Sequence, residues 1–389
     1  MNKKHLDLIT LPCSSSDWIK FGNVLEQTES WEKDFVQNFT SPAEPLNGGR
    51  WRIWYGAGMP YTIAVAEGVP GEKMTKYQAV LTTGEPADAP LSIGNLPEGW
   101  RPIQSVHIKM KDGLHRLYFW AHCESETQGV KRYLAADSTD GRRFRVVDPY
   151  RPCMYHLDDR AVKFVNTICE GTSKSEVQPN PFYRTNIYRP SDEPAAAPEL
   201  VCNDATTVYQ LADGSFELYT ASVFALQKGD RRWAYNDNAP GWVRVIDRLI
   251  SKDGLLWTGR YRVIEPDADD PSDMQFYHLA VTYTPKGRVG MLGHYRVKDQ
   301  TMDIEWCFSA DGIKWIRPFR RAWLERSWPE QSVDSFGIYP PASIVHYEGK
   351  WWLFYSGVNF SHNSKLSHGK SQRTVMLAET KSIWANESV

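Results

Sequence analysis

The sequence predicts an all-β protein that is built from five copies of a four-stranded antiparallel unit. Two repeated phrases support this prediction. The pattern Ser-x-Asp-Gly-x-x-aromatic occurs three times, at residues 138–144, 251–257 and 309–315. A glycine followed by a strand-like run, in most copies rich in aromatic residues, occurs five times, at residues 49–56, 113–120, 214–220, 287–293 and 349–356. Internal repeats of this kind indicate one supersecondary unit that is used several times along a chain.

Each phrase predicts one part of the unit. The Asp-Gly pair predicts a tight turn, because glycine accepts a positive φ and aspartate can hydrogen-bond its own backbone. The glycine-aromatic run predicts a strand that a short turn joins to the apolar strand before it. A third strand ending in Ala or Ser and a closing strand, on either side of the Asp-Gly turn, complete the unit. Because few segments show a helical period, these repeats predict a five-bladed β-propeller.

The repeats account for nearly the whole chain of 389 residues, so we expect a single domain. The five blades are expected at about residues 34–90, 102–150, 200–265, 273–323 and 334–389. The first and last units lack the full Asp-Gly phrase, and we expect residues 15–30 to supply the missing outer strand of the last blade and close the ring. Residues 151–199 break the repeat and are rich in proline and small residues, which predicts an inserted loop over one face.

Composition excludes several classes of partner. The formal net charge of −2 and the short basic runs argue against a nucleic-acid-binding surface. No apolar run is long enough to cross a membrane, and no stretch of signal-peptide length follows Lys3 and Lys4, so we expect a cytoplasmic protein. The six cysteines lack metal-type spacing and are expected to be reduced thiols. Nothing in the sequence predicts the oligomeric state.

In a propeller the first strand of each blade lines the central channel, so we expect a site where these strands begin. The candidates for catalysis there are Asp34, Asp204 and Asp273. The candidates for substrate binding are Asn38, Gln104, His107, Glu199, Arg244, Gln275, Tyr277, His278, Asp334, Tyr339 and His362. Each aspartate alone is also consistent with a turn or a strand cap, but polar groups that recur around one axis favour a site. Asp34 and Asp334 each lie 17 residues before a Trp of their unit, Trp51 and Trp351, which suggests that they are equivalent.

The sequence does not predict a cofactor. The histidines are spread over several units without HExxH or CxxC spacing and are more typical of structural residues, although a divalent metal in the channel is an open alternative. The chain contains no P-loop, no GxGxxG and no GxSxG motif, so neither nucleotide binding nor a serine nucleophile elbow is indicated.

The motifs at residues 49–56 and 349–357, together with Ser-x-Asp-Gly-x-x-Trp, resemble those of five-bladed β-propeller glycosidases. Families of this group act on arabinans, xylans and fructans, and mannoside phosphorylases are related to them. The likeness spans essentially the whole chain and rests on structural motifs. It implies a base or nucleophile in the first blade, a pKa-tuning Asp in the second and a Glu acid in the third.

This sequence matches that pattern only in part. Asp34 matches the first role by position, but Gln104 and His107 stand where the second-blade Asp is expected. The third unit has Asp204, with Glu199 slightly upstream, which implies a divergent arrangement that uses Asp204 and Asp273. The Asp-Gly turns are also similar to the Asp boxes of six-bladed sialidases, but here the spacing is one residue shorter and five units are counted.

The sequence therefore predicts a glycoside hydrolase that cleaves a glycosidic bond in an oligosaccharide or small glycoside. Two carboxyl groups would act as general acid and as base or nucleophile. Aromatic residues, 13% of the chain, would fill the core and leave some rings for stacking on sugar. Two alternatives stay open. One is a non-catalytic carbohydrate-binding propeller. The other is a different reaction on the same scaffold: a glycoside phosphorylase, with Arg160, Arg244 and Arg296 as candidate phosphate ligands, or a metal-dependent lyase.

Overall fold

A computed structural model describes the fold. It covers residues 17–32, 36–37, 41–58, 62–82, 91–96, 99–123, 130–149, 153–155, 200–226, 229–232, 242–327, 332–362 and 372–384. Within these ranges the side chains of residues 80–82, 122–123, 130–132, 154–155, 200–204, 223–225, 242 and 258–260 are not described. In this part of the chain the protein is all-β, and its one named helical element is the 3-10 turn η2 (Ser30–Glu32).

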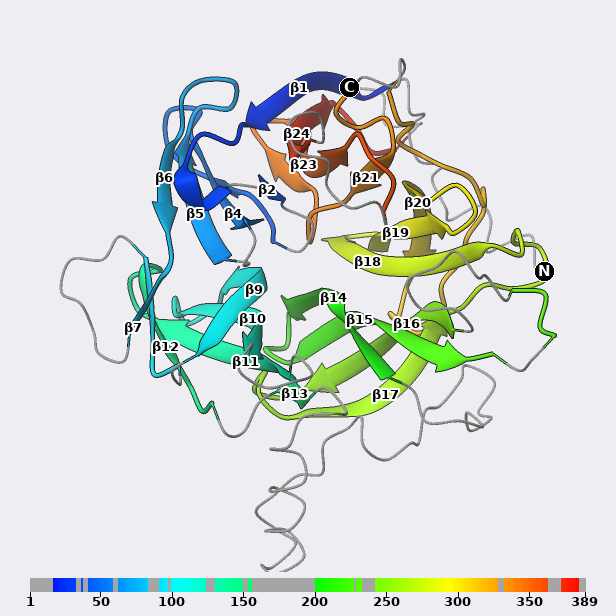
Figure 1. The fold of residues 1–389 in the computed structure, drawn as a ribbon, viewed down its shortest axis with the longest axis horizontal. Coiled ribbons are helices and arrows are strands. Elements are labelled where there is room, and N and C mark those ends of the chain that lie inside the picture. The colour runs from blue at the N-terminus through cyan, green and yellow to red at the C-terminus, as the bar shows by residue number, and fades with distance from the viewer. Residues whose placement is uncertain are drawn as a thin grey trace, which may run out of the picture.

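The strands form four hydrogen-bonded sheets that are arranged around a common centre (Figure 1). The first sheet has the order β2-β4-β5-β6, and β3 also pairs with β4. Its strands are β2 (Val36–Gln37), β3 (Glu44–Pro45), β4 (Trp51–Ala57), β5 (Thr62–Gly68) and β6 (Thr75–Gln78).

The second sheet has the order β7-β8-β12-β11-β10-β9, and β13 also pairs with β11. Its strands are β7 (Val80–Thr82), β8 (Ser92–Gly94), β9 (Trp100–Lys109), β10 (His115–Cys123), β11 (Val130–Ser138), β12 (Arg143–Val146) and β13 (Met154–Tyr155). The third sheet has the order β14-β15-β16-β17. Its strands are β14 (Leu200–Gln210), β15 (Phe216–Ala225), β16 (Trp242–Ser251) and β17 (Trp257–Ile264).

The fourth sheet has the order β1-β24-β23-β21-β20-β19-β18, and β22 also pairs with β23. Its strands are β18 (Met274–Thr284), β19 (Gly287–Arg296), β20 (Thr301–Ser309), β21 (Gly337–Tyr339), β22 (Val345–Tyr347), β23 (Lys350–Val358), β24 (Arg373–Thr380) and β1 (Ile19–Leu25). A single pair, Met302 with Gly337, joins β20 to β21, so this sheet consists of two sections. The outer strand of the second section is β1, which pairs antiparallel with β24.

The three Asp-Gly turns have the same hydrogen bonds, which confirms that they are copies of one motif. In the second turn the Ser251 hydroxyl accepts the amide of Gly254 at 2.9 Å, and Oδ1 of Asp253 accepts the amides of Leu255 and Leu256 at 2.8 and 2.9 Å. The first and third turns repeat these bonds. The same motif therefore forms the same local hydrogen bonds at three places in the chain.

Two of these turns also form contacts between sheets. Gly254 has a φ of +74°, and a Cβ atom at this position would clash with the hydroxyl of Tyr118 in β10. That hydroxyl donates to the carbonyl oxygen of Gly254 at 2.9 Å. A Cβ atom at Gly312 would likewise clash with the hydroxyl of Tyr219 in β15, which donates to Glu217. Glycine is therefore required both by the backbone and by the neighbouring sheet.

A buried carboxylate is held in the same way in the first sheet and in the β21–β1 section. The Tyr55 hydroxyl donates to Glu32 at 2.6 Å, and the Lys76 ammonium donates to Glu32 at 2.8 Å. Asp334, which is 1% exposed, accepts a hydrogen bond from Lys20 at 2.8 Å and one from Tyr355 at 3.0 Å. We call each set a carboxylate–tyrosine–lysine clamp.

The strand registers of the two clamps correspond. In the first sheet Ile53 pairs with Ala66, and Ala66 pairs with Lys76 of β6. In the β21–β1 section Leu353 pairs with Ala378, and Ala378 pairs with Lys20 of β1. The strand β1 therefore takes the place in its section that β6 takes in the first sheet. The counterpart of Asp334 is Glu32, and not Asp34 as the spacing to Trp51 and Trp351 suggests.

Candidate functional site

Polar and aromatic side chains gather where several inner strands begin. We call this group the inner cluster; its members are Gln37, Arg244, Gln275, Tyr277, His278, Tyr295, Tyr339, Phe360, His362 and Arg373. They come from the starts of β18 and β24, the end of β19, from β2, β16 and β21, and from the segment after β23. In an antiparallel pair the start of one strand lies beside the end of the next, so β18 and β19 bring Gln275 and Tyr295 together.

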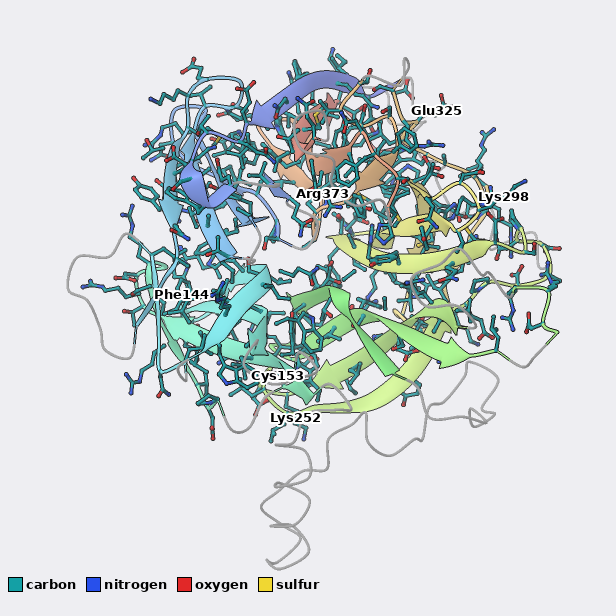
Figure 2. All side chains as sticks on the ribbon, viewed as in Figure 1. Phe144, Cys153, Lys252, Lys298, Glu325 and Arg373 are labelled. Atoms are coloured by element: carbon teal, nitrogen blue, oxygen red, sulfur yellow. The ribbon has the colours of Figure 1, made fainter. Side chains whose placement is uncertain are left out.

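One side of the inner cluster joins the first sheet to the β21–β1 section. Nη1 of Arg373 donates to Oε1 of Gln37 at 2.8 Å. The guanidinium of Arg373 also lies 5.7 Å from the ring centre of Tyr339 and 5.4 Å from that of Phe360. Arg373 is labelled in Figure 2, at the start of β24. A cation placed over aromatic faces is stabilised by the ring quadrupole, so this guanidinium has a fixed position.

The other side of the cluster joins the third sheet to β18. Arg244 is 3% exposed, and its Nη1 donates to Oε1 of Gln275 at 2.5 Å. Its guanidinium lies 5.2 Å from the ring centre of Tyr277 and 5.3 Å from that of Tyr295. The side chain therefore bridges two sheets and is held on both its polar and its flat face.

Two histidines lie between these sides. Nδ1 of His362 is 2.8 Å from the Tyr339 hydroxyl, and its ring is 4.9 Å from that of Tyr277. His278 is 1% exposed and lies 5.9 Å from the Tyr339 ring. Burial lowers the pKa of His278 to about 3, so this imidazole is neutral near pH 7.

A glycine makes room for His278. A Cβ atom at Gly293 of β19 would lie 2.5 Å from its Nε2 atom. Residues 287–293 are the copy of the glycine-aromatic phrase with the fewest aromatic residues. Gly293 in this copy leaves the space that His278 of the inner strand β18 needs. The arrangement of His278 depends on Gly293.

The inner cluster brings together six of the residues that the sequence predicts for a site: Arg244, Gln275, Tyr277, His278, Tyr339 and His362. Phenol, imidazole, amide and guanidinium groups on a largely aromatic surface are the directional polar groups of a small-molecule site. They can donate hydrogen bonds to hydroxyl and ring oxygens and can stack on the apolar face of a ring.

Three other candidates, His107, Asp334 and Asp273, have contacts outside the inner cluster. His107 stacks on Trp54 with ring centres 4.6 Å apart, and its Nε2 lies 3.0 Å from Nδ1 of His115, between the first and second sheets. Asp334 belongs to the clamp with Lys20 and Tyr355. The stack of His107 joins two sheets, and the contacts of Asp334 hold β1 to its own section, so both side chains are occupied.

Asp273 lies at the start of β18 but forms an ion pair. Arg296 donates to its two oxygens at 2.7 and 3.2 Å, which fastens the end of β19 to the start of β18. Burial would raise the pKa of Asp273, but the hydrogen bonds and charge of Arg296 lower it below its usual range. Asp273 therefore remains an anion at neutral pH and is unsuited to be a general acid.

Gln104 has a φ of +48° and lies in a register shift of β9, between the pairs formed by Tyr118 and Trp120. Asp204 lies in β14, also at a register shift, and its side chain is outside the described residues. The candidates Asp34, Asn38 and Glu199 are outside the described residues altogether. The roles of these five residues stay predictions.

The prediction of candidates missed Tyr295, Phe360 and Arg373, and it left Gln37 out of the selected set. The sequence search considered the starts of first strands, whereas Tyr295 ends a second strand and Arg373 begins a third. In an antiparallel blade both of these ends lie at the same edge as the start of the first strand. The antiparallel order of the strands in each unit therefore contained the signal that could have identified them.

Among the described residues, no group of three or more His, Cys, Asp or Glu side chains could hold a metal ion. In the same part of the chain no helix has the length and apolar character needed to cross a membrane.

No model of a protein family matches this sequence, and no curated protein matches it by sequence. Solved structures do share its fold. A protein titled glycoside hydrolase aligns over 100% of this chain and 98% of its own, with 12% identity and a TM-score of 0.57. A thermostable family-43 glycoside hydrolase aligns over 91% of each chain, with 11% identity and a TM-score of 0.54.

An N-acetylgalactosamine deacetylase from F. plautii, solved in complex with blood group B trisaccharide, aligns over 94% of this chain and 95% of its own, with 15% identity and a TM-score of 0.54. At these identities the likeness establishes the fold. The structural neighbours include glycoside hydrolases of propeller-type families, as the resemblance in sequence motifs implies, and this chain has an all-β fold similar to theirs.

Proposed function

We propose that the protein is a glycoside hydrolase that cleaves a glycosidic bond of an oligosaccharide or small glycoside at the inner cluster. The observation that carries this proposal is the position of the cluster: aromatic and hydrogen-bonding side chains of three sheets converge where the inner strands begin, in a fold similar to that of solved glycosidases. Polar groups on aromatic walls suit a sugar, which has apolar C–H faces and hydroxyl edges.

We further propose that the fold is a five-bladed propeller, with the two sections of the fourth sheet as separate blades. Five apolar clusters of the described residues support this count, because each lies between two successive groups of strands. One of these clusters packs Leu25, Phe354 and Leu377 of the fifth group against Trp51 and Ile53 of the first sheet. The matching registers of the two clamps support β1 as the outer strand of the fifth blade.

The catalytic carboxyl groups in this proposal are Asp34 and Asp204. Asp34 lies two residues before Val36 of β2, next to the Gln37 that binds Arg373. Asp204 directly precedes Ala205, which packs with Tyr277 and Tyr339 in the inner cluster. In this proposal the two residues approach the cluster from different parts of the chain, as a pair of carboxyl groups on opposite sides of a glycosidic bond requires.

The described residues then have supporting roles. One carboxyl group must be protonated to act as the acid while the other is ionised, and their environments must separate the two pKa values. Arg244 and Arg373 favour ionisation of a carboxyl group near them. Tyr339, His362 and Gln275 orient the sugar hydroxyl groups. Asp273 is not a catalyst in this arrangement, because its ion pair with Arg296 fixes the β18–β19 hairpin.

The test is a screen of the purified protein against aryl arabinofuranosides, xylosides, mannosides and galactosides and against short fructans. Each substrate is tested with and without phosphate and a chelator. We expect release of one sugar without a need for phosphate, and a loss of kcat of a thousandfold or more in Asp34→Asn and in Asp204→Asn. The matched control is Asp213→Asn, an aspartate of an exposed turn.

Full activity of both variants would refute the assignment of the two carboxyl groups. Turnover only in the presence of phosphate would identify a phosphorylase. Sugar binding that is detected by thermal shift without turnover would identify a carbohydrate-binding propeller.

A further inference from the structure

Two hollows meet at the seam where β1 lies against the first sheet. One has a volume of about 390 Å³ and the other of about 330 Å³. Both are lined by Asn23 and Val24 of β1 and by Gly71 of the β5–β6 turn, so they adjoin along β1. We call them together the seam groove. Each hollow is within the size range of sites that bind small molecules.

The larger hollow is aromatic. Trp51 of β4, Tyr347 of β22 and Trp352 of β23 line it, and the ring centre of Trp51 lies 5.5 Å from each of the other two. Nε1 of Trp352 donates to the carbonyl oxygen of Tyr347 at 3.1 Å, which fixes the indole. Phe21 of β1 forms another part of the wall and is 54% exposed. The hollow thus presents rigid aromatic surface to solvent.

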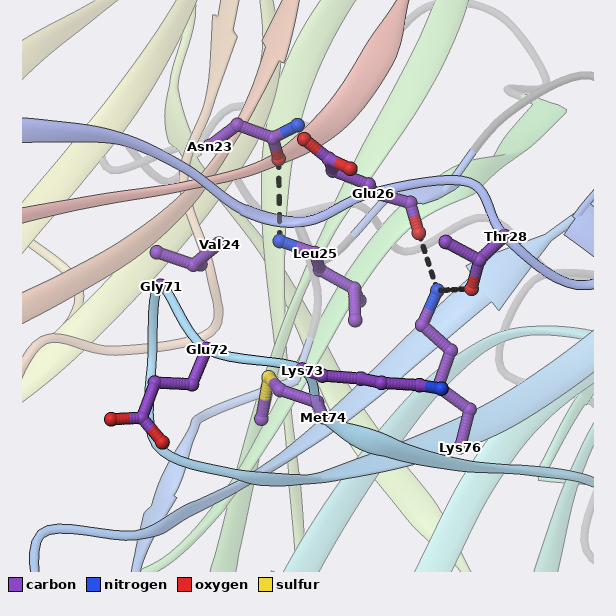
Figure 3. A pocket seen from close by; sticks show the side chains of 10 residues that line it. All are labelled: Asn23, Val24, Leu25, Glu26, Thr28, Gly71, Glu72, Lys73, Met74 and Lys76. Carbon is purple, nitrogen blue, oxygen red and sulfur yellow. Dashed lines mark hydrogen bonds between the residues drawn. The ribbon is translucent and has the colours of Figure 1, made fainter.

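The smaller hollow carries charged side chains at an apolar floor that Val24, Leu25 and Met74 form, as Figure 3 shows. Glu26, Glu72 and Lys73 line it and are exposed. Lys76 is held by the carbonyl oxygen of Glu26, by the Thr28 hydroxyl at 3.0 Å and by its clamp with Glu32. Charges of both signs are therefore present, which favours a ligand without net charge that offers hydroxyl groups as donors and acceptors.

The seam groove lies at the opposite end of the strands from the inner cluster. Trp51, at the start of β4, lines the groove, whereas Gly56, near its end, pairs with Gln37 of the cluster. Along β23, Trp352 lines the groove and Ser356 pairs with Tyr339. With a rise of about 3.3 Å per strand residue, the two places are separated by roughly 13–17 Å along the strands. The groove is thus distinct from the proposed reaction site.

We propose that the seam groove is a second carbohydrate site, which binds a neutral oligosaccharide. The apolar face of one sugar ring stacks on the exposed ring of Phe21 and the half-buried indole of Trp352. The hydroxyl groups of the adjoining ring donate to the carboxylates of Glu26 and Glu72. Two adjoining hollows, one aromatic and one with charged side chains beside apolar ones, match two linked sugar rings better than they match an apolar or a charged ligand.

The experiment is electrophoresis of the full chain in native gels that contain soluble arabinan, xylan, galactan or mannan, with retardation giving Kd. We expect at least one polymer to retard the protein. Phe21→Ala and Glu72→Gln should each raise its Kd by about tenfold or more. Leu256→Ala is the matched control, because this exposed apolar side chain lies in the second Asp-Gly turn and outside the groove. Trp352→Ala is less informative alone, since its ring also packs in the core.

The channel variant Asp204→Asn separates this proposal from the proposed function. Retardation that persists in Asp204→Asn but weakens in Phe21→Ala supports the groove, whether or not any glycoside is hydrolysed. Three results would overturn it: no retardation by any polymer, equal retardation of the wild type and both groove variants, or loss of retardation in Asp204→Asn alone.

Discussion

The clamp formed by Lys20 and Asp334 allows a stringent test of how β1 is held. The substitution is Lys20→Met, which keeps most of the apolar stem and removes the ammonium group. In the wild type this ammonium donates to Asp334 at 2.8 Å, to the carbonyl oxygen of Glu325 at 2.6 Å and to the Ser327 hydroxyl at 3.1 Å. The substitution leaves a carboxylate that is 1% exposed with hydroxyl groups, those of Tyr355 and Ser327, in place of a cation.

The expected cost follows from this burial. Removing one member of a buried ion pair costs about 3–5 kcal/mol, because the remaining charge is not compensated. The Lys20 side chain is 25% exposed, so water partly screens the pair and we expect a loss near the lower end, about 3 kcal/mol.

The cost should depend on pH. Burial would raise the pKa of Asp334, but Lys20 and two hydroxyl groups lower it below its usual range. A lowered pKa in the folded state stabilises the protein above the pKa of the unfolded chain. This stability is lost as the pH falls through the folded-state value. The difference between Lys20→Met and the wild type should therefore narrow as the pH falls below about 4.

The assay is urea unfolding followed by tryptophan fluorescence, at pH 7 and at lower pH. Lys73→Met, at an exposed lysine, is the matched control, and Asp334→Asn completes a double-mutant cycle. We expect the double variant to be less destabilised than the sum of the single variants. A loss below about 1 kcal/mol at pH 7 would refute the reasoning, because that is the value of an exposed pair.

Three further substitutions test other buried contacts by the same unfolding assay. Gly254→Ala should cost about 2–4 kcal/mol, because its φ is +74° and the new Cβ meets Tyr118; an unchanged midpoint would contradict this. Glu217→Gln should cost about 3–5 kcal/mol, because the fully buried carboxylate accepts hydrogen bonds from two arginines; a loss below about 1 kcal/mol would argue against it. Burial lowers the pKa of His107 to about 3, so stability should fall by up to about 1.4 kcal/mol per unit as the pH drops from about 6.5 toward that value. His107→Gln should remove this part of the slope, and an identical slope in the variant would exclude His107 as its source.

Features set by short segments could be predicted from the sequence. The Asp-Gly turns are an example, because Ser251, Asp253 and Gly254 make their hydrogen bonds within six residues. The starts of strands were also informative, since Gln275, Tyr277 and His278 lie at the beginning of β18 and in the inner cluster.

Long-range contacts and register shifts could not be predicted. His107 is the eighth residue of β9, and the shift at Gln104 precedes it, so the strand carries it away from the entrance to its stack on Trp54. Asp334 has the composition of a site residue, but its partner Lys20 is 314 residues away in the sequence. Single-sequence patterns do not contain such pairings.

The pairing of β1 with β24 has a consequence for synthesis. The ribosome adds about 5–20 residues per second, so β1 waits roughly 15–60 s after Lys20 is made before Asp334 follows it. During that interval the nascent chain presents an unpaired strand with Ile19 and Phe21, which are exposed even in the finished fold. The same strand from a second nascent chain fits β24 equally well. Crowded synthesis or concentrated refolding should therefore yield strand-exchanged dimers, and dilution should favour the monomer.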